Sequence, residues 1–200
     1  SPILPFSSSL AAGDNRWLPV RPGSDLALAM GMVRWIIDNE RYDAQYLTQP
    51  GPAAMAAAGE ASWSNATHLL VNDPQHPRYG QFLRGTDIGL PMPEPVDEKT
   101  PAQDVYVVQL ADGSLVAHTV GQSAELLVER DFTPIKAQGS ESNATEEPTA
   151  IAVCSAFVKL RAEAHRKTIA EYAALCDVPV KEIEDLAREF TSYGKQAVAN

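Results

Sequence analysis

The chain lacks the patterns that carry most enzyme chemistry. Its 200 residues contain only two cysteines, Cys154 and Cys176, which do not lie at metal-ligand spacing from the four histidines. No G-x-S-x-G, G-x-x-x-x-G-K-[ST] or G-x-G-x-x-G motif is present. The sequence therefore predicts no hydrolytic triad, metal site or glycine-rich phosphate loop. It favours two buried apolar cysteines, with a disulfide as the alternative.

Basic residues are also scarce. The chain has 16 Lys and Arg against 26 Asp and Glu, a formal net charge of −10. Binding to a phosphate backbone needs clustered Lys and Arg, so the composition argues against nucleic acid as a partner. No apolar run approaches the roughly 18 residues that would cross a bilayer. With 44% hydrophobic and 21% charged residues, the composition is typical of a soluble globular domain.

The most informative stretch that is present is WLPVRPGSD, residues 17–25. Pro22 and Gly23 predict a turn after a strand-like segment, and Asp25 places a carboxylate at the start of the helix that follows. This helix has apolar residues at helical spacing, which predict its buried face: Leu26, Met30, Val33 and Ile37, widened by Leu28, Met32 and Ile36. A turn and a helix N-terminus of this kind can hold a nucleotide.

Three parts follow one another along the chain. Up to about residue 89, helical patterns at 42–47 and 52–60 precede a buried strand at 68–72. From about Leu90 to Thr149 the sequence is rich in strand and turn signals. Its clearest feature is a hairpin, because VYVVQL and SLVAHTV flank an Asp-Gly pair, Asp112 and Gly113.

From Ala150 onward the sequence predicts helices. Val153, Phe157 and Leu160 share a helical face, and Thr168 with Glu171 forms a capping box. After Pro179 a second apolar stripe ends near Gly194, a predicted C-cap; its members are Ile183, Leu186, Ala187 and Phe190.

The order of these patterns predicts an α/β fold. We expect residues 1–200 to form one α/β domain, a Rossmann-like three-layer dinucleotide-binding domain, with residues 90–149 as a β-rich insertion. The abrupt, extended start at SPILPF and the strand-like KQAVAN at the other end indicate a fragment of a larger protein.

Two stretches carry a family resemblance. WLPVRPGSDLALAMGMVRWIIDNERYDAQYL and KTIAEYAALCDVPVKEIEDLAREF resemble segments of the large catalytic subunits of the molybdopterin oxidoreductases of the dimethyl sulfoxide reductase family. Asp177 stands where the family commonly has Gly. Within the family, the stretches WIIDNERYDAQYLTQPG and AAGEASWSNATHLLV look most like the reductases of sulfur oxyanions such as tetrathionate.

The resemblance implies a cofactor and residues that contact it. In the family, the Asp that matches Asp25 binds the guanine of one molybdopterin guanine dinucleotide. A carboxylate can accept from the N1–H and N2–H₂ groups of guanine together. Pro22 and Gly23 would fix the turn and let the backbone approach, while Arg21 and Ser24 would contact the cofactor, orient the turn or cap the helix.

For the whole catalytic subunit, the resemblance implies molybdenum bis(molybdopterin guanine dinucleotide) and a 4Fe-4S cluster, the latter outside this chain. It also implies anaerobic respiration on the periplasmic side of a bacterial cytoplasmic membrane, reducing tetrathionate to thiosulfate. The implied partners are the remaining domains of the same polypeptide, together with one iron-sulfur electron-transfer subunit and one membrane quinol-oxidising subunit.

The chain departs from the family in ways that limit its chemistry. Where many members carry D-P-R, it reads Leu4, Pro5 and Phe6, and it has neither the cysteine cluster nor the metal ligand. We therefore expect no catalytic or metal-binding residue here and no activity of the chain alone. Two alternatives stay open at this point: a non-catalytic interaction domain, or the same domain of a formate, nitrate or arsenate-type molybdoenzyme.

Overall fold

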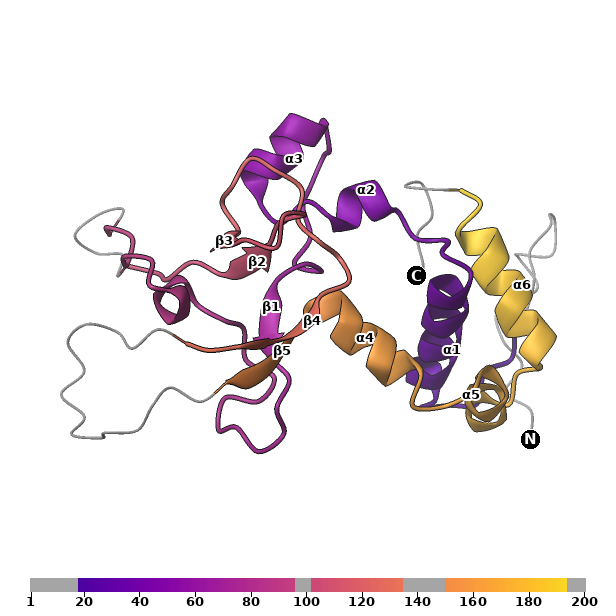
Figure 1. Cartoon of the computed structure of the whole chain (residues 1–200). Helices are drawn as coiled ribbons and strands as arrows, with labels where there is room; N and C mark the ends of the chain where they lie inside the picture. Colours follow the sequence, from indigo (N-terminus) through magenta and orange to yellow (C-terminus); the bar gives the residue numbers. More distant parts are fainter. Residues whose placement is uncertain (1–17, 96–101, 135–149, 194–200) are drawn as a thin grey trace. The chain divides into compact units, whose positions relative to one another are not determined.

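A computed structural model of the chain describes residues 18–95, 102–134 and 150–193 (Figure 1). The chain divides into two compact units, one of residues 1–41 and 164–200 and one of residues 42–163. In the described residues the first, the helical unit, contains no strand, whereas the second, the sheet unit, contains every strand.

Three helices pack together in the helical unit: α1 (Asp25–Asp38), α5 (Ile169–Cys176) and α6 (Val180–Phe190). Their core is apolar; it comprises Ala173, Cys176, Val178 and Ile183, with Leu18, Val20, Ala27, Leu28, Met32 and Ile169 packed against it. Gly31 allows α1 to approach closely, since a Cβ there would lie 3.2 Å from Cγ2 of Ile183. The absence of a side chain at Gly31 thus fixes the spacing of α1 and α6.

The predicted capping box at the start of α5 is confirmed. The Oγ1 atom of Thr168 accepts from the Glu171 amide (3.2 Å), and Oε2 of Glu171 accepts from the Thr168 amide (2.7 Å). This is the capping box expected from the sequence. Ile183 and Ala187 of the α6 stripe are buried. The prediction of a C-cap at Gly194 is wrong, because α6 ends at Phe190 with Thr191 as its C-cap; Gly194 itself lies outside the described residues.

The predicted buried face of α1 is partly wrong. Ile37 is buried as expected, but Leu26 is 74% exposed, and the buried positions centre on Gly31 and Trp35. The apolar pattern runs almost all round this helix, so periodicity alone does not fix its orientation. The close approach at Gly31 decides which side faces α5 and α6.

The sheet unit contains short elements, most of them close to the predicted positions. They are α2 (Ala44–Leu47), α3 (Pro52–Ala58), β1 (Leu69–Val71), a 3-10 helix (Gly85–Ile88), β2 (Val107–Gln109), β3 (Leu115–Ala117), β4 (Glu129–Phe132), β5 (Ile151–Ser155) and α4 (Ala156–Ala164). The helices expected at 42–47 and 52–60 and the buried strand at 68–72 are therefore confirmed.

The described residues of this unit form two antiparallel sheets. One has the order β1-β5-β4, with Leu70 opposite Cys154 and Arg130 opposite Val153. The other is the predicted hairpin of β2 and β3, in which Val108 lies opposite Val116. Its turn is confirmed too, because Gly113 has φ +84° and donates its amide to the Leu110 carbonyl.

The prediction of helix from Ala150 onward is wrong for residues 151–155. This segment is β5, and Val153, assigned to a helical face, is a fully buried strand residue paired on both sides. A short apolar run fits either structure, and the β-branched residues Ile151 and Val153 favour the central strand. The helix begins only at Ala156, with Phe157 buried and Leu160 43% exposed.

One core joins residues on both sides of the predicted insertion boundary. Val107 and Val128 from the 90–149 segment pack with Leu69 and Val153. The described strand pairings are all antiparallel, and no Rossmann-like layering is shown by them. The mixed composition of helix and sheet agrees with the expected class, while the Rossmann-like three-layer domain stays a prediction.

Candidate functional site

The predicted turn at Pro22 and Gly23 is present. The Arg21 carbonyl accepts from the Ser24 amide at 3.1 Å and from the Ser24 Oγ at 2.6 Å. Gly23 has φ +80°, and proline followed by a residue of positive φ is the pattern of a type II turn. A Cβ at Gly23 would meet nothing within 4 Å, so glycine is needed for its conformation, and the space beside it is open.

The start of α1 leaves polar groups available next to this turn. The Ser24 carbonyl accepts from the amides of Ala27 (2.9 Å) and Leu28 (3.3 Å), but its hydroxyl bonds back to Arg21 and does not cap the helix. Within the described ranges, the amides of Asp25 and Leu26 and the carboxylate of Asp25 form no hydrogen bond or ion pair. Asp25 is exposed, so this carboxylate can accept from a ligand.

A main-chain hydrogen bond fixes the other side of the turn. The Arg21 amide donates to the carbonyl of Cys176, the last residue of α5, at 2.9 Å. Just before it, Leu18 and Val20 pack against the core that contains Cys176. The five predicted contact residues, Arg21 to Asp25, thus form one continuous exposed segment on a packed support; only Ser24 is half-buried.

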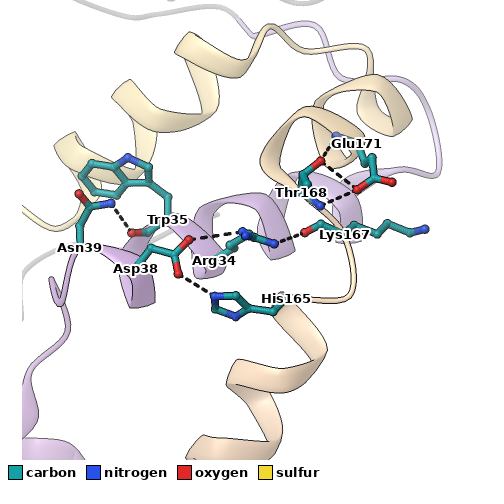
Figure 2. Close-up of polar contacts among 8 residues, drawn as sticks. All are labelled: Arg34, Trp35, Asp38, Asn39, His165, Lys167, Thr168 and Glu171. Carbon is teal, nitrogen blue, oxygen red and sulfur yellow. Dashed lines mark hydrogen bonds and ion pairs between the residues drawn. The ribbon is translucent and has the colours of Figure 1, made fainter.

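A second polar cluster lies at the opposite end of α1 (Figure 2). Asp38 accepts from Nε2 of His165 at 2.7 Å and pairs with Nε of Arg34 at 3.3 Å. Arg34 also donates to the Lys167 carbonyl, directly before the capping box of α5. His165, interpreted from sequence as a lone histidine on a charged helix, is thus part of an ion-pair cluster within the helical unit.

Nearby, hydrogen bonds from Thr168, the amide first, lower the pKa of the Glu171 carboxyl. Every member of the cluster is tied to another protein group. These contacts join α1 to the segment that leads into α5, which favours a structural role for the cluster.

Two further histidines meet in the sheet unit, which sequence reasoning missed. The rings of His68 and His118 lie 5.2 Å apart between centroids, in contact with Tyr106 and flanked by Trp63. Spacing gave no sign of this pair. The predicted hairpin did indicate one contact of this cluster, because the register that follows from the Asp-Gly turn places Tyr106 opposite His118.

Burial favours the neutral form of both imidazoles and outweighs the hydrogen bond from His68 to the Pro50 carbonyl, which by itself raises the pKa of His68. Nε2 of His68 donates to the Pro50 carbonyl at 2.9 Å, and Nδ1 of His118 accepts from the Tyr106 amide at 3.1 Å. Only an unprotonated Nδ1 can accept, so the proton of His118 lies on Nε2. Burial lowers the pKa of both imidazoles below the ordinary value. The pair therefore acts as a packed structural element.

Other chemistry is absent from the described part of the chain. Cys154 and Cys176 are both buried free thiols, as the sequence favours, and burial raises the pKa of the Cys154 thiol. No group of three or more His, Cys, Asp or Glu in residues 18–95, 102–134 and 150–193 is arranged to hold a metal ion. Over the same residues, no helix is long and apolar enough to cross a membrane.

Comparison with known proteins gives a consistent set of relatives, although no family model matches the sequence. Over 98% of its length the chain is 41% identical to one subunit of the tetrathionate reductase of Salmonella typhimurium, of which it spans 17%. It is 33% identical over 98% of its length to one subunit of the selenate reductase of Mesobacillus selenatarsenatis, of which it spans 16%. The corresponding tetrathionate reductase polypeptide of Archaeoglobus fulgidus is 30% identical over 90% of the chain, which spans 13% of it.

These relatives define the class of protein as an oxidoreductase, and this chain corresponds to one part of its catalytic subunit. By this similarity the chain belongs to the molybdopterin oxidoreductases, the family that its motifs predict. The chain spans about one sixth of the length of the first two relatives. The similarity runs through both units and includes the segment from Arg21 to Asp25.

Proposed function

We propose that the helical unit binds the guanine end of a molybdopterin guanine dinucleotide through Asp25. The observation that carries this proposal is an exposed carboxylate with no protein partner in the described residues, at the start of α1 beside an open glycine turn. A carboxylate offers two oxygens to the N1–H and N2–H₂ donors of guanine, and charged acceptors make the stronger hydrogen bonds.

The surrounding residues fit such a ligand. Gly23 leaves the space beside the turn open, and the free amides of Asp25 and Leu26 point out of the positive end of a helix of 14 residues. Arg21 and Ser24 support the turn by the bonds at the Arg21 carbonyl, and Pro22 presets its backbone angle. In the bound state the cofactor would supply the two-electron chemistry, and this segment would orient one end of it.

For the whole catalytic subunit we propose a respiratory reductase of a sulfur oxyanion, with tetrathionate as the substrate and thiosulfate as the product. Two of the relatives, at 41% and 30% identity, belong to enzymes named tetrathionate reductase. The proposal also includes a periplasmic location, a molybdenum bis(molybdopterin guanine dinucleotide) centre, a 4Fe-4S cluster, an iron-sulfur partner subunit and a membrane quinol-oxidising subunit. Of the groups in this proposal, only the guanine end of the cofactor would contact this chain. The others would be held by other parts of the subunit or by its partners.

The test uses the full-length catalytic subunit with Asp25→Asn, which keeps the shape of the side chain but replaces an acceptor and its charge with an amide. Guanine nucleotide released on acid denaturation is measured per mole of protein. The variant loses one charge-assisted bond and the charge that strengthens the other, about 3 kcal/mol in all, which predicts at least a tenfold fall in nucleotide content at limiting cofactor.

The control is Glu40→Gln, which makes the same change of charge at an exposed residue just beyond the other end of α1. It should leave the nucleotide content unchanged. Equal content in the wild type and Asp25→Asn would refute the role of Asp25. An equal loss in both variants would show that net charge, and not a guanine contact, matters.

A further inference from the structure

The corner between α5 and α6 touches the candidate turn through one main-chain hydrogen bond. The carbonyl of Cys176 accepts from the Arg21 amide at 2.9 Å. Arg21 in turn holds Ser24 by two hydrogen bonds to its own carbonyl. A shift of the Cys176 carbonyl would therefore move Arg21 and, with it, Ser24 and the start of α1, where Asp25 lies.

The residue after Cys176 decides whether α5 continues and uses the Cys176 carbonyl as a helical acceptor. Asp177 has φ +59°, in the left-handed region, and ends α5. The amides of Asp177 and Val178 both turn back to the Ala173 carbonyl. This closure satisfies the end of the helix and leaves the Cys176 carbonyl to accept from Arg21.

Apolar packing ties the same two segments together. Cys176 and Ile183 are fully buried, and Val178 is nearly so. Leu18 and Val20, which lead into the turn, pack against this cluster. The hydrogen bond from Arg21 thus lies beside a packed apolar contact. Together they hold the turn in a fixed orientation relative to the corner between α5 and α6.

We propose that Asp177 is a positioning residue for the guanine-binding turn: its left-handed backbone ends α5, leaves the Cys176 carbonyl for the Arg21 amide and so sets the place of the Asp25 carboxylate. The role belongs to the backbone and needs no contact of the Asp177 side chain with a ligand. It rests on the proposed function for its purpose, although the positioning itself can be measured without any ligand.

The residue type at position 177 is the variable of the test. Glycine adopts the left-handed region freely, asparagine tolerates it, alanine is strained, and a β-branched residue is strained most. We therefore expect the order Gly, Asn, Asp, Ala, Val for how firmly the Arg21 amide is held. Amide exchange of the 15N-labelled chain is measured at Arg21 and, as an internal reference, in the middle of α1.

Asp177→Val should speed exchange at Arg21 about tenfold relative to the reference amides, the factor expected for a strained left-handed residue, and should shift the amide signals of Gly23 to Leu26. Asp177→Gly should keep or increase the protection. Lys181→Val is the matched control, because it puts the same side chain into the exposed first turn of α6. If Asp177→Val fails to fold, Asp177→Ala gives the same comparison with a smaller change.

Unchanged exchange at Arg21 in a folded Asp177→Val or Asp177→Ala chain would overturn the positioning role. A second measurement, the affinity for GMP, should fall in the same variants and recover in Asp177→Gly. If the wild-type chain does not bind GMP while Arg21 exchange still follows residue 177, the proposed function fails and the positioning stands. If GMP binds but its affinity does not follow residue 177, the proposed function stands and the role of Asp177 in positioning the guanine-binding turn fails.

Discussion

The candidate turn of the helical unit and the buried core of the sheet unit differ in how far their polar groups are paired with other protein groups. At its candidate turn, the helical unit leaves the Asp25 carboxylate exposed and without a partner in the described residues. The sheet unit buries Gln49, His68, Ser155 and Thr67, and it gives every one of them except Thr67 a hydrogen-bond partner for its side chain. A buried, satisfied group serves the fold, whereas an exposed group at an open turn is available to a ligand.

The connection between α2 and α3 shows how the sheet unit is held together. The carbonyls of Thr48, Gln49 and Pro50 accept from the Ala124 amide, the Ser64 amide and the His68 ring. Three separate segments thus converge on a few residues. We therefore expect large stability effects for changes here and small ones at the candidate turn, where binding should change instead.

The largest effect is expected for Gly51→Ala. A Cβ at Gly51 would lie 2.5 Å from the carbonyl oxygen of His118, and neither backbone segment can yield easily. Overpacking of this kind costs about 3 kcal/mol. Gly121→Ala is the control, since a Cβ there meets nothing within 4 Å. The free energy of unfolding in urea should be lower for Gly51→Ala than for Gly121→Ala. Similar values would show that the hairpin is not in close contact with this connection.

The second-largest effect is expected at acid pH, which should lower the stability of the sheet unit. The folded pKa values of His68 and His118 lie below the unfolded value of about 6.5, so the unfolded chain binds more protons as the pH falls through that value. The stability is complete above about pH 6.5 and declines below it, by at most about 1.4 kcal/mol per pH unit for each histidine, until the folded pKa values are reached.

His118→Gln keeps an acceptor for the Tyr106 amide but cannot titrate. Its unfolding free energy, measured from pH 7 to pH 5, should therefore fall less steeply than that of the wild type. His76→Gln, at a histidine in no aromatic contact among the described residues, should retain the part of the slope that comes from His118. A His118→Gln slope as steep as the wild type would mean that His118 does not couple folding to protonation.

A moderate effect is expected in the helical unit away from its turn. Thr168→Ala removes the hydroxyl that accepts from the Glu171 amide, and loss of such a cap costs about 1 kcal/mol. Thr119→Ala, at an exposed threonine, should change the unfolding free energy by less than about 0.5 kcal/mol. A cost at Thr168 no larger than at Thr119 would mean that the capping box does not stabilise α5.

Local signals in the sequence were sufficient for much of this fold. The capping box at Thr168 and Glu171, the hairpin at Asp112 and Gly113, and the turn at Pro22 and Gly23 all depend on residues within a few positions of each other. The candidate site could be found for the same reason, because its five predicted residues are consecutive.

The features that the sequence did not predict depend on distant partners. Residues 151–155 form a strand because β1 and β4 flank them, and Leu26 is exposed because Gly31 faces Ile183. His68 meets His118 only through the folding of the hairpin. The bond from Arg21 to Cys176, which joins the two motifs of the family resemblance, likewise has no local signal.

The most direct test of the central claim measures stability and binding together at Asp25. Because Asp25 is exposed and its carboxylate has no hydrogen bond or ion pair in the described part of the chain, Asp25→Asn loses only the interaction with the positive end of α1 and should change the unfolding free energy by less than about 1 kcal/mol. In a titration of the wild-type chain, GMP should bind more tightly than IMP, which lacks the N2 amine, and Asp25→Asn should remove this preference. Equal affinities of the wild type for GMP and IMP, or a preference that survives in Asp25→Asn, would contradict a guanine contact at Asp25.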